Sequence, residues 1–79
     1  MNEFSNIKKG IYRHNKKGSM YEVLGVALHT EENEPLVIYR PLDDAMYELF
    51  ARPYTMFIEN VEINGEIQPR FEYISNIVK

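Results

Sequence analysis

The residues best suited to bind a ligand are arginines that stand beside aromatic side chains. A guanidinium group forks onto a carboxylate or a phosphate, and its plane stacks on an aromatic ring. Such arginines fall within the predicted strands or at their ends, instead of in the loops where a merely solubilising arginine would sit. We predict a ligand-binding groove lined by residues of this kind: Tyr12, Arg13, Tyr39, Arg40, Phe50 and Arg52.

The alternative is that these arginines serve the fold itself. Their aliphatic stems would pack on tyrosine rings, and their charged heads would pair with acidic residues such as Glu22, Glu48 or Glu72. The binding hypothesis requires the groove side chains on one exposed face. Burial of both the Arg40 and Arg52 guanidinium groups in internal ion pairs would count against it.

Other chemistry has little support in the residues. There is no cysteine, and the four glycines are scattered, so neither a thiol nucleophile nor a glycine-rich phosphate loop is present. His14 and His29 are the two histidines, and a metal site would need both of them plus a carboxylate such as Glu31 or Glu34. An enzyme would need one of the histidines with a nearby carboxylate. We keep that enzyme as the less favoured alternative, and predict no catalytic residue, no metal and no cofactor.

Length and composition indicate one small domain. The 79 residues are 44% hydrophobic and 27% charged, as in ordinary globular proteins, so residues 1–79 are read as one domain with an ordered core of about 10–74. A net charge of −3 disfavours sequence-independent nucleic-acid binding, although a single-stranded nucleic-acid binder remains an alternative because barrels of this size stack bases on aromatics. The first residues lack a signal peptide and no apolar run is long enough to span a membrane, which predicts a cytoplasmic location.

The first half of the chain predicts two strands and a turn. GIYRH (residues 10–14) forms a short strand, and NKKGS (residues 15–19) is a turn in which Gly18 takes a positive φ. MYEVLGVALH (residues 20–29) forms the longest strand, but neither of its faces is cleanly apolar. A bulge or bend at Gly25 would resolve this conflict by switching the buried face halfway along the strand.

The stretch from Leu36 to Pro53 predicts a central hairpin. Two apolar runs, residues 36–41 and 46–51, each end in an Arg-Pro step and flank an acidic turn at residues 43–45. Downstream, YTMFIEN (residues 54–60) suits a single helical turn. Asn64-Gly65 then predicts a type I′ hairpin, and Pro69 predicts an edge position for the returning strand.

These elements favour an all-β fold. Turn signals recur at close spacing, and no window longer than ten residues keeps an apolar period of 3.6. We predict a small, partly open antiparallel barrel of SH3-like or OB-like size, with five or six strands and one short helical turn. The alternative is an α+β roll in which residues 41–50 form a helix capped by Asp43.

Taken in order, the motifs resemble the bacterial domain-of-unknown-function 1653 family. The matching pieces extend over nearly the whole chain from Gly10 to Ile74: GIYRH at 10–14, YEVLGVA at 21–27 with His29, EPLV at 34–37, YRPL at 39–42, Arg52-Pro53, Met56-Phe57 and PRF at 69–71. A tryptophan often stands in the family where this chain has Phe50. The resemblance implies a small free-standing or appended bacterial domain, and it supplies no activity.

The function must therefore be argued from the residues. We predict a non-enzymatic small β-barrel that binds a protein, a peptide or a charged small ligand through its arginine and tyrosine side chains. The sequence specifies neither the ligand nor the oligomeric state.

Overall fold

The computed structural model describes residues 7–43 and 45–76. Within them the chain forms seven strands and one short helix, in this order: β1 (Gly10–His14), β2 (Met20–His29), β3 (Glu34–Pro41), β4 (Phe50–Pro53), α1 (Tyr54–Phe57), β5 (Asn60–Ile63), β6 (Glu66–Pro69) and β7 (Phe71–Ser75). The predicted limits of β1 and β2 are confirmed, and so is the helical turn after Pro53.

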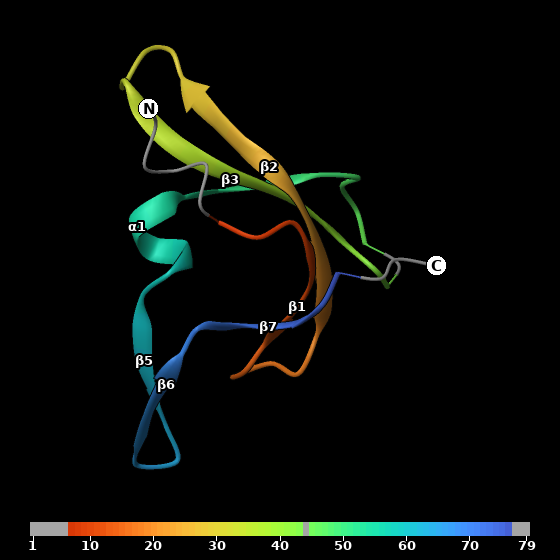
Figure 1. Ribbon diagram of the computed structural model, residues 1–79, viewed down its shortest axis with the longest axis vertical. Helices are drawn as coiled ribbons and strands as arrows, with labels where there is room; N and C mark the ends of the chain where they lie inside the picture. Colours follow the sequence, from red (N-terminus) through yellow and green to blue (C-terminus); the bar gives the residue numbers. More distant parts are fainter. Residues whose placement is uncertain (1–6, 44, 77–79) are drawn as a thin grey trace.

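The strands form two antiparallel sheets. A five-stranded sheet has the order β4-β3-β2-β1-β7, and β5 pairs with β6 in a second, two-stranded sheet. In Figure 1 the β5–β6 hairpin extends below α1, away from the tip of the long β2–β3 hairpin. The predicted antiparallel all-β class is confirmed, with seven strands in place of five or six among the described residues. β4 and β7 are the edges of the five-stranded sheet, and the predicted partly open barrel stays a prediction.

A β-bulge in the long strand β2 brings Val26 of its second half to the same face as the buried Val23 of its first half. Its register against β3 shifts between Val23 and Gly25, which confirms the predicted irregularity. Val23 pairs with Tyr39 and Val26 pairs with Val37, so both valines lie on the same face despite their odd spacing.

The hairpin from Leu36 to Pro53 differs from its prediction in the second strand. β4 begins at Phe50, and residues 46–49 have no strand pairing. Met46 is 89% exposed and Tyr47 is 67% exposed, so this segment has no apolar side against the sheet. The alternative prediction of a helix over residues 41–50 is wrong, because the described residues of this segment are not helical. The predicted acidic turn at residues 43–45 includes Asp44, which lies outside the described residues.

The β5–β6 hairpin is closed by the predicted type I′ turn. Asn64 and Gly65 both have positive φ, 53° and 84°, as the two central residues of this turn require. The strand β6 ends at Pro69, and the chain enters β7 two residues later. Pro69 therefore belongs to a two-stranded sheet in which each strand has an open edge, as predicted.

Aromatic rings dominate the core. Five of the seven buried core residues are aromatic, and the group comprises Tyr12, Tyr21, Val23, Val37, Tyr39, Phe57 and Phe71. Phe57 of α1 stacks on Phe71 of β7, with ring centroids 4.1 Å apart and planes 6° apart. Phe71 also contacts the rings of Tyr21 and Tyr39 edge-on. One helical turn and an edge strand are thereby attached to the central strands.

No helix among the described residues has the length and apolar character needed to cross a bilayer.

We expect Phe71→Ala to lower the free energy of unfolding by about 3–5 kcal/mol, because it removes a buried ring with several ring partners. The matched control is Ile74→Ala on the same strand, where the side chain is 45% exposed and the expected loss is below about 1 kcal/mol. Urea unfolding of both variants measures the difference. Equal losses would contradict the central role of Phe71.

Candidate functional site

Three of the four arginines are paired with a carboxylate, and one is not. Arg13 pairs with Glu72 at 3.1 Å, Arg40 with Glu22 at 2.6 Å, and Arg70 with Glu59 at 3.0 Å; all three pairs are partly exposed to solvent. Two of these acidic partners, Glu22 and Glu72, are those that the fold-serving alternative named. Arg52 has no acidic partner within the described part of the chain.

Arg52 is held by neutral groups instead. Its Nε donates a hydrogen bond of 3.1 Å to the hydroxyl of Tyr39. Its guanidinium carbon lies 5.4 Å from the centroid of the Phe71 ring, in cation–π range. Because these contacts engage one N–H and one face of the group, the two terminal amino groups have no protein partner among the described residues. The two amino groups of this half-buried guanidinium can therefore donate hydrogen bonds to an oxyanion.

A hollow of about 490 Å³ lies beside this arginine. Its walls come from the end of β3, from β4 with the residues before it, and from α1: Tyr39, Tyr47, Leu49, Phe50, Ala51, Arg52, Pro53 and Met56. Arg52 is the one charged residue among them, and the remaining walls are apolar or aromatic. The hollow can therefore accept an apolar group beside a single negative charge.

A second hollow of about 480 Å³ lies on the other side of the segment before β4. Arg40 lines it together with Asp43 and Glu48. Since the Arg40 guanidinium already pairs with Glu22 and two carboxylates face the same space, this hollow is poorly suited to an anion.

The structure brings three of the six predicted groove residues together and separates the other three. Tyr39, Phe50 and Arg52 line the first hollow. Phe50 lies edge-on to Tyr39, with centroids 5.7 Å apart. Their part in binding stays a prediction, but the expected geometry of one exposed face with all six residues is wrong.

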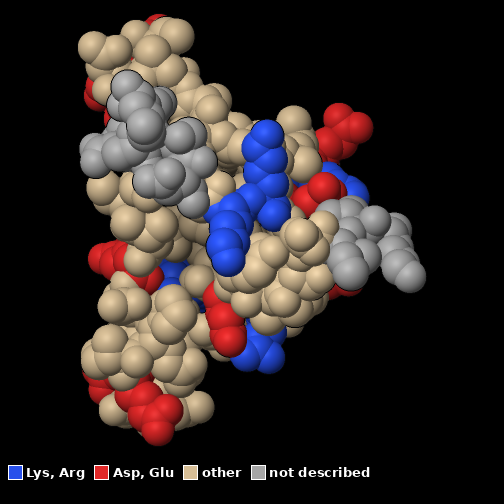
Figure 2. Space-filling model, viewed as in Figure 1, with Lys and Arg blue, Asp and Glu red and all other residues tan. Residues whose placement is uncertain are grey.

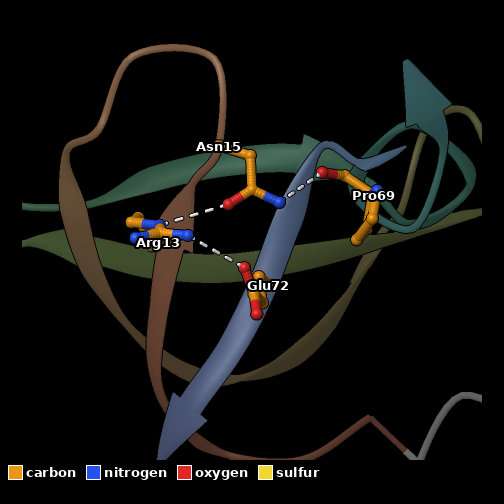
Figure 3. A network of polar contacts seen from close by, with 4 residues as sticks. All are labelled: Arg13, Asn15, Pro69 and Glu72. Atoms are coloured by element: carbon orange, nitrogen blue, oxygen red, sulfur yellow. Dashed lines mark hydrogen bonds and ion pairs between the residues drawn. The ribbon is translucent and has the colours of Figure 1, made fainter. Parts of the chain in front are cut away.

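Arg13 and Arg40 project from the face opposite that of Tyr39 and Arg52. Each follows a buried tyrosine, and neighbouring residues of a strand point to opposite faces. Figure 3 shows the consequence for Arg13, which bonds to Glu72 and to Asn15, while Asn15 donates to the carbonyl of Pro69. These contacts join β1 to the last two strands and leave Arg13 engaged in the fold.

Tyr12 belongs to the core and not to a groove. It is 7% exposed, its hydroxyl donates to the carbonyl of Lys8 at 2.8 Å, and its ring lies edge-on to Phe57 and Tyr73. Burial, with the nearby phenol of Tyr73, raises the pKa of Tyr12 above its ordinary value. Its hydroxyl therefore stays a neutral structural donor at neutral pH.

The two histidines close two similar turns. His14 Nδ1 accepts the N–H of Lys17 at 3.2 Å, and His29 Nδ1 accepts the N–H of Glu32 at 3.2 Å. The last residue of each turn, Gly18 or Asn33, has positive φ and donates its N–H to the carbonyl oxygen of the histidine at 2.6 Å. The sequences HNKKG and HTEEN thus form the same kind of β-hairpin loop.

This arrangement separates the imidazoles. One turn precedes β2 and the other follows it, and a ten-residue strand is about 30 Å long. Neither ring has a carboxylate hydrogen-bond partner within residues 7–43 and 45–76, and no group of three potential metal ligands occurs among these residues. The geometry that the histidine-dependent enzyme required is not found there.

Charges of both signs are mixed on the surface. In Figure 2 basic side chains gather in the middle of the face and acidic ones flank them, while the tip of the β5–β6 hairpin is acidic. A nucleic-acid backbone would meet carboxylates on this face as well as cations. The binding of single-stranded nucleic acid gains no support from this surface.

Sequence reasoning missed several walls of the hollow. Tyr47 and Leu49 were assigned to a strand, although the structure places them in the irregular segment before β4. Phe71 was placed correctly in a strand, but its contact with Arg52 joins residues from opposite edges of the sheet. The available sequence signal was the run of apolar residues 45–50, which is interrupted only by Glu48.

Comparison with known proteins gives one family and one solved structure. The model of the family described as Protein of unknown function (DUF1653) matches residues 10–73. A crystal structure of a DUF1653 protein from Bordetella bronchiseptica is similar in fold, with a TM-score of 0.85 and 31% sequence identity, over 96% of this chain and 97% of that one. No curated protein matches the chain.

The buried His14 predicts a pH dependence of stability. Burial, and after it the charges of Lys17, Arg52 and Arg70, lower the pKa of His14 below its ordinary value of 6.5. The unfolded chain therefore binds a proton more readily than the folded one, and protonation also removes the Nδ1 acceptor. The stabilisation is complete above pH 6.5 and is lost as the pH falls through 6.5 toward the folded-state pKa.

Urea unfolding between about pH 7.5 and pH 5 measures this contribution. We expect His14→Asn to be less stable at neutral pH and to lose part of the pH dependence, whereas the control His29→Asn keeps it. The prediction is wrong if the stability of His14→Asn falls with pH as steeply as that of the original protein.

Proposed function

The chain belongs to the DUF1653 family of proteins of unknown function, and we propose that it is a non-enzymatic binding domain. It recognises a charged ligand, which is a protein, a peptide or a small molecule, through the hollow beside β4. Arg52 supplies the charge, Phe50 supplies aromatic surface next to it, and Tyr39, which is buried, holds Arg52 through its hydroxyl.

The observation that carries this proposal is the charge of Arg52, which has no carboxylate partner among residues 7–43 and 45–76. The chain has twelve acidic and nine basic residues, so carboxylates are abundant, and each of the other arginines has one at hydrogen-bond distance. Partial burial of a cation without a counterion costs free energy. A bound anion would recover that free energy, because it would occupy the two amino groups that have no partner in the described part of the chain.

The curl of the five-stranded sheet supports the same site. Arg52 stands on the edge strand β4, yet it lies over the ring of Phe71 on the other edge strand, β7. In this proposal the two edges form a partly open, SH3-like barrel that side chains close. The guanidinium is thereby held between Tyr39 and Phe71 before a ligand arrives, which reduces the entropy lost on binding.

Small aromatic probes test whether the hollow binds anions at all. We expect benzoate and phenyl phosphate, titrated to about 10 mM into ¹⁵N-labelled protein, to shift the amide resonances of residues 49–53 and Met56. Benzamide, which has similar shape and no charge, should shift them less, because it cannot pair with the guanidinium.

The variant Arg52→Gln should lose these shifts while its spectrum stays that of a folded domain. The matched control Lys16→Gln removes one positive charge from an exposed turn and should bind like the original protein. Shifts that cluster elsewhere, or persist unchanged in Arg52→Gln, would overturn the proposal. So would the absence of any shift with both anions.

A further inference from the structure

We propose that the ligand of this hollow is the C-terminal end of a polypeptide. Its terminal carboxylate pairs with Arg52, its last side chain is apolar and enters the hollow, and its backbone extends along the open edge of β4. This inference rests on the proposed function and adds the chemical class of the partner.

The first observation is the open backbone edge of β4. The strand pairs with β3 on one side and is the last strand of its sheet on the other. Among the described residues, no turn or loop donates a backbone hydrogen bond to residues 50–53 or accepts one from them. An edge of this kind pairs with an added extended segment, and the main-chain hydrogen bonds supply affinity.

The second observation is the course of the hollow. Five consecutive residues, 49–53, line it. Because side chains of a strand alternate between the two faces, a hollow over one face would be lined by every second residue. Lining by consecutive residues places the hollow along the edge of the strand, where an added peptide would lie.

The third observation is the match of charge and apolar surface. Arg52 brings one positive charge and no acidic residue lines the hollow, so the site suits a monoanion better than a phosphate dianion. A terminal carboxylate is such a monoanion, and its two oxygens fit the fork of a guanidinium. In a peptide, the terminal carboxylate is attached to the same Cα atom as the side chain of the last residue. That side chain can contact Leu49, Phe50 and Met56 while the carboxylate pairs with Arg52.

Six-residue peptides with random inner positions test the proposal by fluorescence polarisation. Each pool ends in Leu, Phe or Lys and is made both as a free acid and as a carboxamide. We expect free acids that end in Leu or Phe to bind about tenfold or more tighter than their carboxamides, the range for a hydrogen-bonded charge pair. Pools that end in Lys should bind weakly in both forms.

Arg52→Gln should abolish the difference between acid and carboxamide. Arg52→Lys keeps the positive charge but lacks the two parallel N–H donors of a guanidinium, so it should retain only part of the difference in affinity between acid and carboxamide. The control Lys16→Gln should leave that difference unchanged. Equal affinity of acids and carboxamides would overturn the proposal. Tighter binding of carboxamide peptides with an internal Glu would overturn it too, since the ligand would then be an acidic side chain.

Backbone pairing has its own test. Methylation of peptide nitrogens, one at a time, should weaken binding at alternate positions, because every second N–H of an added strand points at β4. N-acetyl-leucine, which has the same terminal group and no strand, should bind far more weakly than the peptides. Equal binding would contradict the peptide inference and leave the anion site of the proposed function standing; failure of benzoate and phenyl phosphate would remove both.

Discussion

The ring of Phe71 is the contact on which the fold and the site both depend. It stacks on Phe57, meets the rings of His14, Tyr21 and Tyr39 edge-on, and lies under the guanidinium of Arg52. One side chain from an edge strand therefore holds the helical turn, three strands of the sheet and Arg52 in one arrangement. A chain of 79 residues without cysteine has few other means of fixing its edges.

The strand register explains why Arg52 has no carboxylate partner among the described residues. Arg13 stands directly across from Glu72, and Arg40 directly across from Glu22, so each of these pairs forms between neighbouring strands on the outer face. Arg52 stands across from Val37, which is fully buried. The same strand register therefore places a glutamate opposite Arg13 and Arg40, and a buried valine opposite Arg52.

Local patterns determined what could be predicted from the sequence. The turn at Asn64-Gly65 and the bulge near Gly25 depend on neighbouring residues and on one partner strand, and both are found. The pattern of apolar residues does not reveal the burial of tyrosine, since leucine is the more usual core residue; in this structure Leu28 is 58% exposed and Tyr39 only 3%. Which side chains meet across the two sheet edges depends on the curl of the whole sheet, and no short stretch encodes that.

The two Arg-Pro steps show how similar local sequences acquire different roles. In the β3–β4 register Tyr39 faces Phe50 and Val37 faces Arg52, so odd-numbered residues of β3 share a face with even-numbered residues of β4. Arg40 and Arg52 both carry even numbers and therefore lie on opposite faces. A slip of one residue would bring both arginines to one face, but it would also remove Phe50 from the tyrosines that it packs against. Aromatic packing thus fixes the register, and the register leaves one guanidinium in its ion pair with Glu22 and the other open at the hollow.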